Sequence, residues 1–259
     1  MDKDILILYG VVALYALVFG SFLNVCILRI PAGESVVRGS SHCPHCNRKL
    51  RIWELIPVLS WLILRGKCHG CGAKISAQYP IVEASNAVLW VLAAHFCGFT
   101  WALPLQCALM SALLGLAVID ARTGEIPFCF NVFIGVIAVL RVALAVYTQG
   151  DILAVVPYLI GMLAVFVPLY LIYRLSGRRA VGGGDVKLML TTGLFLGWKL
   201  VLLGFLVGCV LGSIIHIIRM KAAGAGRSLA LGPYLAAGLT LALLFGEKVI
   251  LWYMLMLVW

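Results

Sequence analysis

Repeated apolar runs of about twenty residues constrain this chain more than any other feature of its sequence. They recur from residue 5 to the C-terminus, and few charged residues lie within them. Asp, Glu, Lys and Arg make up only 12% of the residues, about half the share in a soluble domain. The runs are too long and too uniform for barrel strands, which alternate with a period of two. The chain is therefore expected to be an all-α, polytopic membrane protein.

The apolar runs predict about eight transmembrane helices. The expected spans are 5–28, 81–97, 101–119, 127–148, 152–173, 186–198, 200–218 and about 231–245. The first is long and starts with mixed charges, so we expect a retained helix and not a cleaved signal peptide. The aromatic residues after Glu247 are typical of a membrane interface. We therefore expect the chain to have three parts: a first transmembrane helix (1–28), a basic loop (29–80) and a membrane core (81–259).

The basic residues are distributed unevenly between the predicted loops. Four segments hold 16 of the 20 Lys and Arg, namely 29–80, 120–127, 174–187 and 219–230. The positive-inside rule places such loops in the cytoplasm, which makes the bilayer the inner, cytoplasmic membrane. Topology and contact with anionic lipids explain the net charge of +10. We therefore expect no nucleic-acid partner.

Four cysteines in the basic loop form two Cys-x-x-Cys pairs. The pairs are CPHC (43–46) and CHGC (68–71), with 21 residues between Cys46 and Cys68. Two such knuckles can complete a tetrahedral zinc site of four thiolates, which would stabilise a loop with little core. A thiol–disulfide redox role and disulfide bonds are alternatives, although a reducing cytoplasm disfavours the latter. The neighbouring histidines are alternative ligands, and they are His42, His45 and His69.

Two aspartates lie at the edges of predicted spans. Asp120 ends one in GLAVIDARTGEIP, and Asp185 opens another in GGGDVKLML, on the same side of the membrane. Ionisable residues at such positions are candidates for function. Two close carboxyl groups share one proton, so one can activate water while the other polarises a peptide carbonyl. Residues Gly182, Gly183 and Gly184 would let the backbone approach an unwound substrate strand. A transporter with a carboxylate proton relay is the alternative.

The GGGD motif matches the GxGD signature of membrane aspartyl proteases. With GSFLNVCILRIP (20–31), GESVVRGSSHCPHC (33–46), the 54–83 segment and GPYLAAG (232–238), the chain resembles the type IV prepilin peptidase family from residue 20 to about 240. The resemblance implies that Asp120 and Asp185 are catalytic and that Cys43, Cys46, Cys68 and Cys71 are the family's loop cysteines. It departs at Phe128, where the family often has an acidic residue.

The resemblance also implies a substrate and a second activity. Family members cleave the basic leader from type IV prepilins or pseudopilins at the cytoplasmic face. Many also methylate the new N-terminus with S-adenosylmethionine, an activity attributed to the N-terminal half. Glu34 is a candidate for that half, although the chain shows no Gly-rich nucleotide loop. Four glutamates are candidate binding partners for the basic leader, and the sequence does not rank them. They are Glu34, Glu54, Glu83 and Glu125.

Overall fold

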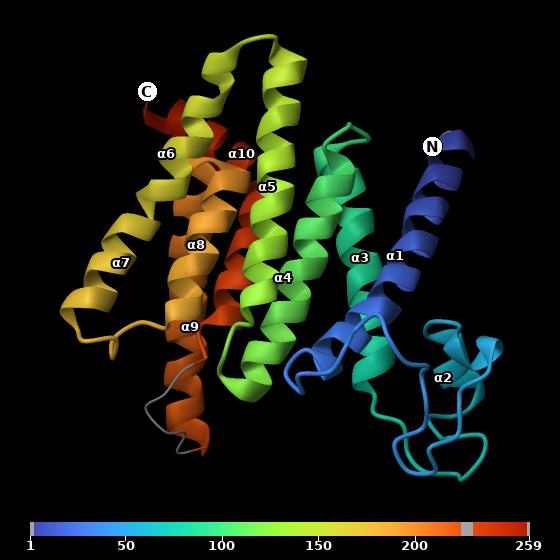
Figure 1. Cartoon of the computed structure of the whole chain (residues 1–259). Coiled ribbons are helices and arrows are strands. Elements are labelled where there is room, and N and C mark those ends of the chain that lie inside the picture. Colours follow the sequence, from blue (N-terminus) through green and yellow to red (C-terminus); the bar gives the residue numbers. More distant parts are fainter. Residues whose placement is uncertain (1–2, 224–229, 258–259) are drawn as a thin grey trace. The chain divides into compact units, whose positions relative to one another are not determined.

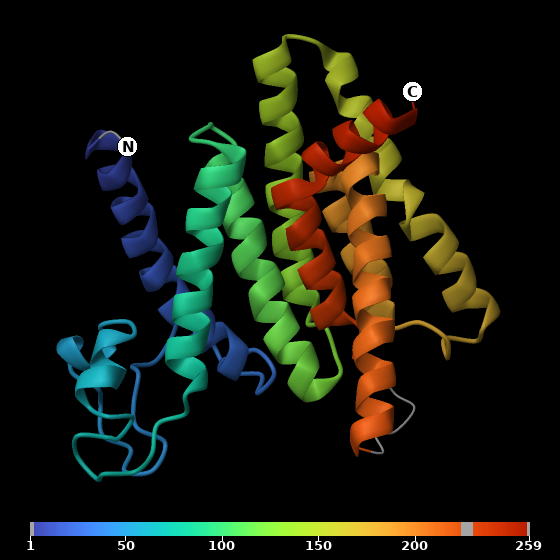
Figure 2. The same ribbon diagram turned by 180° about the vertical axis from the view of Figure 1, so that it is seen from behind.

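The computed structural model describes residues 3–223 and 230–257, so residues 224–229 of the last basic segment lie outside it. The chain divides into two compact units, Met1–His95 and Phe96–Trp259, drawn in Figures 1 and 2. Within the described residues, seven helices are long and apolar enough to cross a membrane. The expected all-α, polytopic class is confirmed.

The first unit is built on two long helices, α1 (Lys3–Arg29) and α3 (Gln78–Cys97). They approach closely at Gly20, where a methyl group would lie 2.9 Å from the Cα of Glu83. Buried asparagines add hydrogen bonds beside this contact: Asn24 donates to the carbonyl of Tyr79 at 3.1 Å, and Asn86 donates to that of Ala16 at 2.7 Å. These polar contacts define the register between two helices that are otherwise largely apolar.

The segment between these helices has little regular structure. It contains the short helices η1 (Ile52–Leu55) and α2 (Leu59–Ile63), and two isolated β-bridges, His42–Lys49 and Lys67–Lys74. Each bridge closes a turn that carries one Cys-x-x-Cys pair. The loop therefore depends on its turns and polar contacts for its shape.

The second unit is a helical bundle. Its elements are α4 (Leu103–Thr123), α5 (Phe128–Gln149), η2 (Ile152–Val155), α6 (Val156–Ala164), α7 (Phe166–Leu175), α8 (Gly183–Leu196), α9 (Trp198–Ala223) and α10 (Gly232–Leu257). The predicted span 152–173 is divided at Val165. Pro168 is the cause, because proline cannot donate a hydrogen bond to the carbonyl four residues earlier.

Helix α8 is the shortest of the predicted spans, and it lies against α5, α6, α7 and α9. Its 14 residues extend about 21 Å at a rise of 1.5 Å per residue, less than the roughly 30 Å of a hydrocarbon core. Gly193 of α8 lies against the backbone of Gly161 in α6 with no room for a methyl group. The helix is thus held by close backbone contact with its neighbours.

The last helix is longer than the sequence suggested. Gly238 of α10 meets the backbone of Gly204 and Gly208 of α9, so these two helices also approach closely. The predicted end of the final span near residue 245 is wrong, since α10 continues to Leu257. No proline interrupts the helix after Gly246, and Figure 2 shows its last turns leaving the direction of its first ones.

Candidate active site and metal centre

Asp120 lies in the last two turns of α4 and is buried, with 4% of its surface exposed. The backbone N–H of Gly232 donates a hydrogen bond to its Oδ2 at 2.9 Å, across 112 residues of sequence. Gly232 is the first residue of α10. Helix N-termini carry unsatisfied N–H groups and partial positive charge, which favour a carboxylate. The start of α10 therefore orients the Asp120 carboxyl group.

Asp185 lies in the first turn of α8. Its carboxyl group accepts a hydrogen bond from the backbone of Gly182, and it interacts electrostatically with Asp120. Figure 1 shows the end of α4 and the start of α8 at the same end of the second unit. The structure thus brings together the two aspartates that the sequence singled out. Their catalytic role remains a prediction.

The glycines before Asp185 have close neighbours within the chain. A methyl group on Gly182 would lie 2.7 Å from Oδ2 of Asp185, and one on Gly184 would lie 2.8 Å from Cβ of Ile126. One on Gly183 would lie 3.3 Å from the hydroxyl of Tyr173. Ile126 belongs to the turn after Asp120, so Gly184 permits the two aspartate-bearing segments to approach. The backbone slot for substrate stays a prediction beside this packing role.

The two Cys-x-x-Cys pairs form matching turns. In the first, Cys43 N–H donates to the carbonyl of Arg48 at 3.0 Å; in the second, Cys68 N–H donates to that of Ala73 at 2.8 Å. Asn47 and Gly72 occupy equivalent positions and both have positive φ, 56° and 72°. Asparagine and glycine are the residues that best tolerate this conformation. Each turn thereby directs its two thiols to the same side.

The four thiols gather in one place. The sulfurs of Cys43, Cys46, Cys68 and Cys71 all lie within 4.8 Å of one another, and Sγ of Cys43 is 3.9 Å from Sγ of Cys71. A tetrahedral zinc with Zn–S bonds of about 2.3 Å requires sulfurs about 3.8 Å apart. All nine cysteines lie among the described residues and are free thiols. The residues fit a four-sulfur metal site better than a disulfide pair.

Two of the three neighbouring histidines, His42 and His69, take part in other contacts. A ring nitrogen of His42 lies 3.2 Å from the carbonyl of Ser40, and the ring of His69 packs edge-on against Trp53. The metal-ligand cluster found among the described residues contains the cysteines alone. Hydrogen bonds from the backbone of Cys71 and Gly70 lower the pKa of Cys68 to about 6, which favours the thiolate needed for metal binding.

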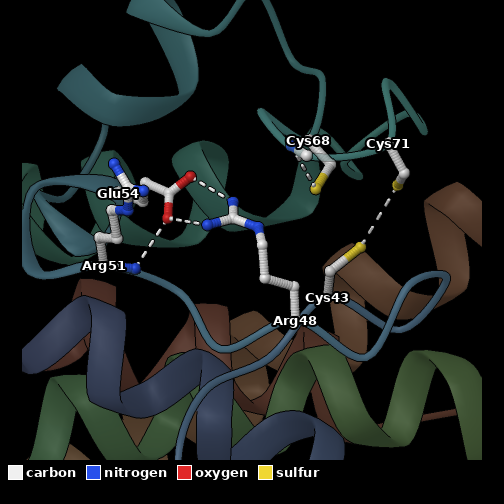
Figure 3. A network of polar contacts seen from close by, with 7 residues as sticks. Cys43, Arg48, Arg51, Glu54, Cys68 and Cys71 are labelled. Carbon is white, nitrogen blue, oxygen red and sulfur yellow. Dashed lines mark hydrogen bonds and ion pairs between the residues drawn. The ribbon is translucent and has the colours of Figure 1, made fainter.

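An ion pair lies beside the cluster of four thiols (Figure 3). The guanidinium of Arg48 binds both carboxylate oxygens of Glu54, at 2.6 and 3.1 Å, and the N–H of Arg51 adds a bond of 2.7 Å. Arg48 and then Arg51 hold the pKa of Glu54 below its ordinary value despite burial. Arg48 also interacts electrostatically with the thiol of Cys68. The ion pair therefore fixes the guanidinium of Arg48 beside the cluster of thiols.

Comparison with known proteins identifies the family. Residues 14–97 match the bacterial peptidase A24 N-terminal domain, and residues 107–217 match the type IV leader peptidase family. A prepilin leader peptidase/N-methyltransferase of Stutzerimonas stutzeri is 33% identical, over 90% of this chain and 89% of the relative. The chain belongs to the type IV leader peptidase family.

Other leader peptidases are similarly related. The prepilin leader peptidase/N-methyltransferase of Pseudomonas aeruginosa is 31% identical, over 91% of this chain and 90% of the relative. That of Dickeya chrysanthemi is 35% identical, over 90% and 92% respectively. No solved structure gives a significant match. The family resemblance inferred from the motifs is confirmed.

The tertiary structure adds two features of this leader peptidase site that sequence reasoning missed. Gly232 contacts Asp120, although its segment GPYLAAG stood out only for its family resemblance. The Nζ of Lys187 lies 4.9 Å from the ring centre of Phe128, within the range of a cation–π contact. Phe128 is the position at which the chain departs from the family pattern. The ring of Phe128 thus gives the ammonium group of Lys187 a cation–π partner at a position where the family often has a carboxylate.

The four glutamates considered as partners of a basic leader fall into two groups. Glu54 binds Arg48, and Glu83 is buried and accepts a hydrogen bond from the N–H of Val58 at 2.7 Å. Both carboxylates are therefore engaged within the chain. Glu34 and Glu125 are exposed, and Glu125 lies in the turn that follows Asp120. Of the two exposed glutamates, Glu125 is nearer in sequence to Asp120, and this position favours it as the partner of a basic leader.

Proposed function

We propose that this chain is a membrane aspartic endopeptidase that removes the basic leader peptide from type IV prepilins or pseudopilins. The observation that carries it is that Asp120, near the end of α4, interacts electrostatically with Asp185, at the start of α8, in a chain of the type IV leader peptidase family. The relatives are named prepilin leader peptidases. The transporter alternative is not supported, because family and relatives are peptidases.

The proposed chemistry uses both carboxyl groups. The ionised one takes a proton from water, and the water oxygen attacks the scissile carbonyl carbon. The protonated one gives its proton to the carbonyl oxygen. Collapse of the tetrahedral species breaks the C–N bond. The departing amine takes a proton from the acid formed first, and a hydroxyl of the new carboxylic acid returns a proton to the other carboxylate. The N–H of Gly232 keeps the Asp120 carboxyl group in a fixed orientation through these steps.

We place the site at the cytoplasmic face of the inner membrane. The support is the concentration of Lys and Arg in the loops that flank Asp120 and Asp185. A prepilin offers a basic leader on this side and an apolar helix within the bilayer. The cut would lie where the two meet, which is also where the aspartates lie in the predicted topology.

We assign Cys43, Cys46, Cys68 and Cys71 to a structural zinc ion. Four protein ligands leave no open position for substrate, so zinc would stabilise the loop and take no part in hydrolysis. Methylation of the new N-terminus is proposed from the relatives' names. S-adenosylmethionine would supply the methyl group, and exposed Glu34 is the candidate residue in the N-terminal unit.

The decisive experiment replaces each aspartate by asparagine. Asp120→Asn and Asp185→Asn, each co-expressed with a prepilin, should leave the precursor uncut at normal enzyme level. Asp151→Asn is the matched control, because Asp151 only caps a short helix through Leu153. Mass analysis of the pilin N-terminus reads the cut and any added methyl group. Cleavage by either active-site variant would reject the proposed function.

A further inference from the structure

The loop between α1 and α3 carries an apolar surface that neither the aspartate pair nor the metal centre explains. It is formed by η1, α2 and the turn between them, here called the 52–63 segment. Ile52 is 89% exposed and Ile63 is 71% exposed. The exposed large apolar side chains of the segment are Ile52, Trp53, Leu55, Ile56, Leu59, Leu62 and Ile63. A clustered apolar surface of this kind marks an interaction site.

A hydrogen bond fixes the 52–63 segment to a membrane helix. The N–H of Val58, in the turn between η1 and α2, donates to Oε2 of Glu83 at 2.7 Å. Glu83 is buried in α3, five residues after that helix begins at Gln78. At a rise of 1.5 Å per residue, this point lies about 8 Å along the helix. The apolar surface is therefore held near the first turns of a helix long enough to span a bilayer.

The backbone at Val58 shows how firmly this position is specified. Val58 has a φ of +61°, a conformation that a β-branched residue rarely adopts and that costs free energy. The bond to buried Glu83 is the contact that holds this turn in place.

The charges around the 52–63 segment complement an anionic surface. Arg51 precedes the segment, Arg65 and Lys67 follow it, and all three are exposed. Its single acidic residue, Glu54, is neutralised by Arg48. Basic residues beside an apolar surface attract anionic headgroups. Apolar side chains at the level of a helix start, flanked by cations, are typical of segments that lie in a membrane interface.

We propose that the 52–63 segment lies in the headgroup–acyl boundary of the membrane that α1 and α3 cross, with anionic phospholipid as its partner. Its apolar side chains enter the acyl region, and Arg51, Arg65 and Lys67 bind lipid phosphates. This inference rests on the membrane helices and not on the proposed catalysis.

Photo-crosslinking of the full chain tests the inference. Benzoylphenylalanine is placed at Leu59 or Ile63, and at His45 as an exposed control in a cysteine turn. The zinc-loaded proteins are reconstituted in nanodiscs of phosphatidylethanolamine and phosphatidylglycerol, irradiated, and analysed as intact proteins by mass spectrometry. Phospholipid adducts are expected at 59 and 63 and not at 45. A double variant, Arg65→Gln with Lys67→Gln, should lower the adduct yield at position 63 when phosphatidylglycerol is present.

Three results would overturn the proposal. One is the absence of lipid adducts at 59 and 63 in protein that retains its zinc. Another is an adduct to a second copy of the chain, or to an added prepilin, in place of lipid. The third is an equal lipid yield at position 45. None of these depends on peptidase activity, so failure here is distinguishable from failure of the proposed function.

Discussion

Substitution of Gly232 by alanine tests whether the start of α10 orients the carboxyl group of Asp120, the proposed catalytic residue. A methyl group there would lie 2.6 Å from Oδ2 and 2.9 Å from Cγ of Asp120. Real carbon atoms do not approach so closely, so the carboxyl group or the helix start must move. Either movement breaks the 2.9 Å hydrogen bond from the Gly232 N–H.

The size of the effect follows from that bond. A hydrogen bond to a charged group contributes about 1.5–3 kcal/mol. If the bond acts mainly in the transition state, its loss lowers kcat/KM roughly 10- to 150-fold, at 1.36 kcal/mol for each factor of ten. Gly232→Ala should therefore cleave prepilin slowly while keeping its zinc and its expression level.

The assay measures kcat/KM in nanodiscs with a purified prepilin, reading the mature N-terminus by mass. Gly135→Ala is the matched control, because its methyl group would meet only Cγ2 of Thr191 at an ordinary 3.5 Å. Unchanged kcat/KM in Gly232→Ala would refute the orienting role of α10. A similar loss in Gly135→Ala would show that the assay reports helix packing instead.

Three further outcomes are expected. Cys43→Ser should lose zinc by metal analysis and make the 30–77 loop sensitive to protease, whereas Cys26→Ser, in the first helix, should keep its zinc; equal metal content in both would contradict the four-sulfur site. Glu54→Gln should speed hydrogen exchange of the loop. Because the pKa of Glu54 is lowered by Arg48 and Arg51, with His69 nearby, its contribution is present above the ordinary carboxyl pKa of about 4.3. This stabilising contribution of the ionised Glu54 is lost as the pH falls through the folded-state pKa. The difference in hydrogen-exchange rate between Glu54→Gln and wild type should therefore shrink in acid, and a pH-independent difference would contradict this. Gly193→Ala should destabilise the second unit by about 1–3 kcal/mol in chemical denaturation, since its methyl group would meet the backbone of Gly161; stability equal to that of Gly135→Ala would argue against close α6–α8 packing.

Several features could be predicted because their signals are local. Apolar runs of about twenty residues predict membrane helices from transfer free energy alone. The Cys-x-x-Cys spacing predicts a shared site because each turn directs two thiols to one side. The aspartates stood out because a carboxylate at a membrane edge is rare. The error at the end of the last span has a similar cause, since aromatic residues occur in interfacial and spanning helices alike.

By itself the sequence determined the membrane class, the family and the candidate residues for the chemistry. Only the tertiary structure decided which distant groups meet them. Gly232 reaches Asp120 across 112 residues, and Glu83 binds the backbone of Val58 from another helix. The physical reason is that spacing along the chain specifies local geometry, whereas these contacts depend on how closely helices approach. That approach is set by the absence of side chains at glycines such as Gly20 and Gly184, whose neighbours no local pattern reveals.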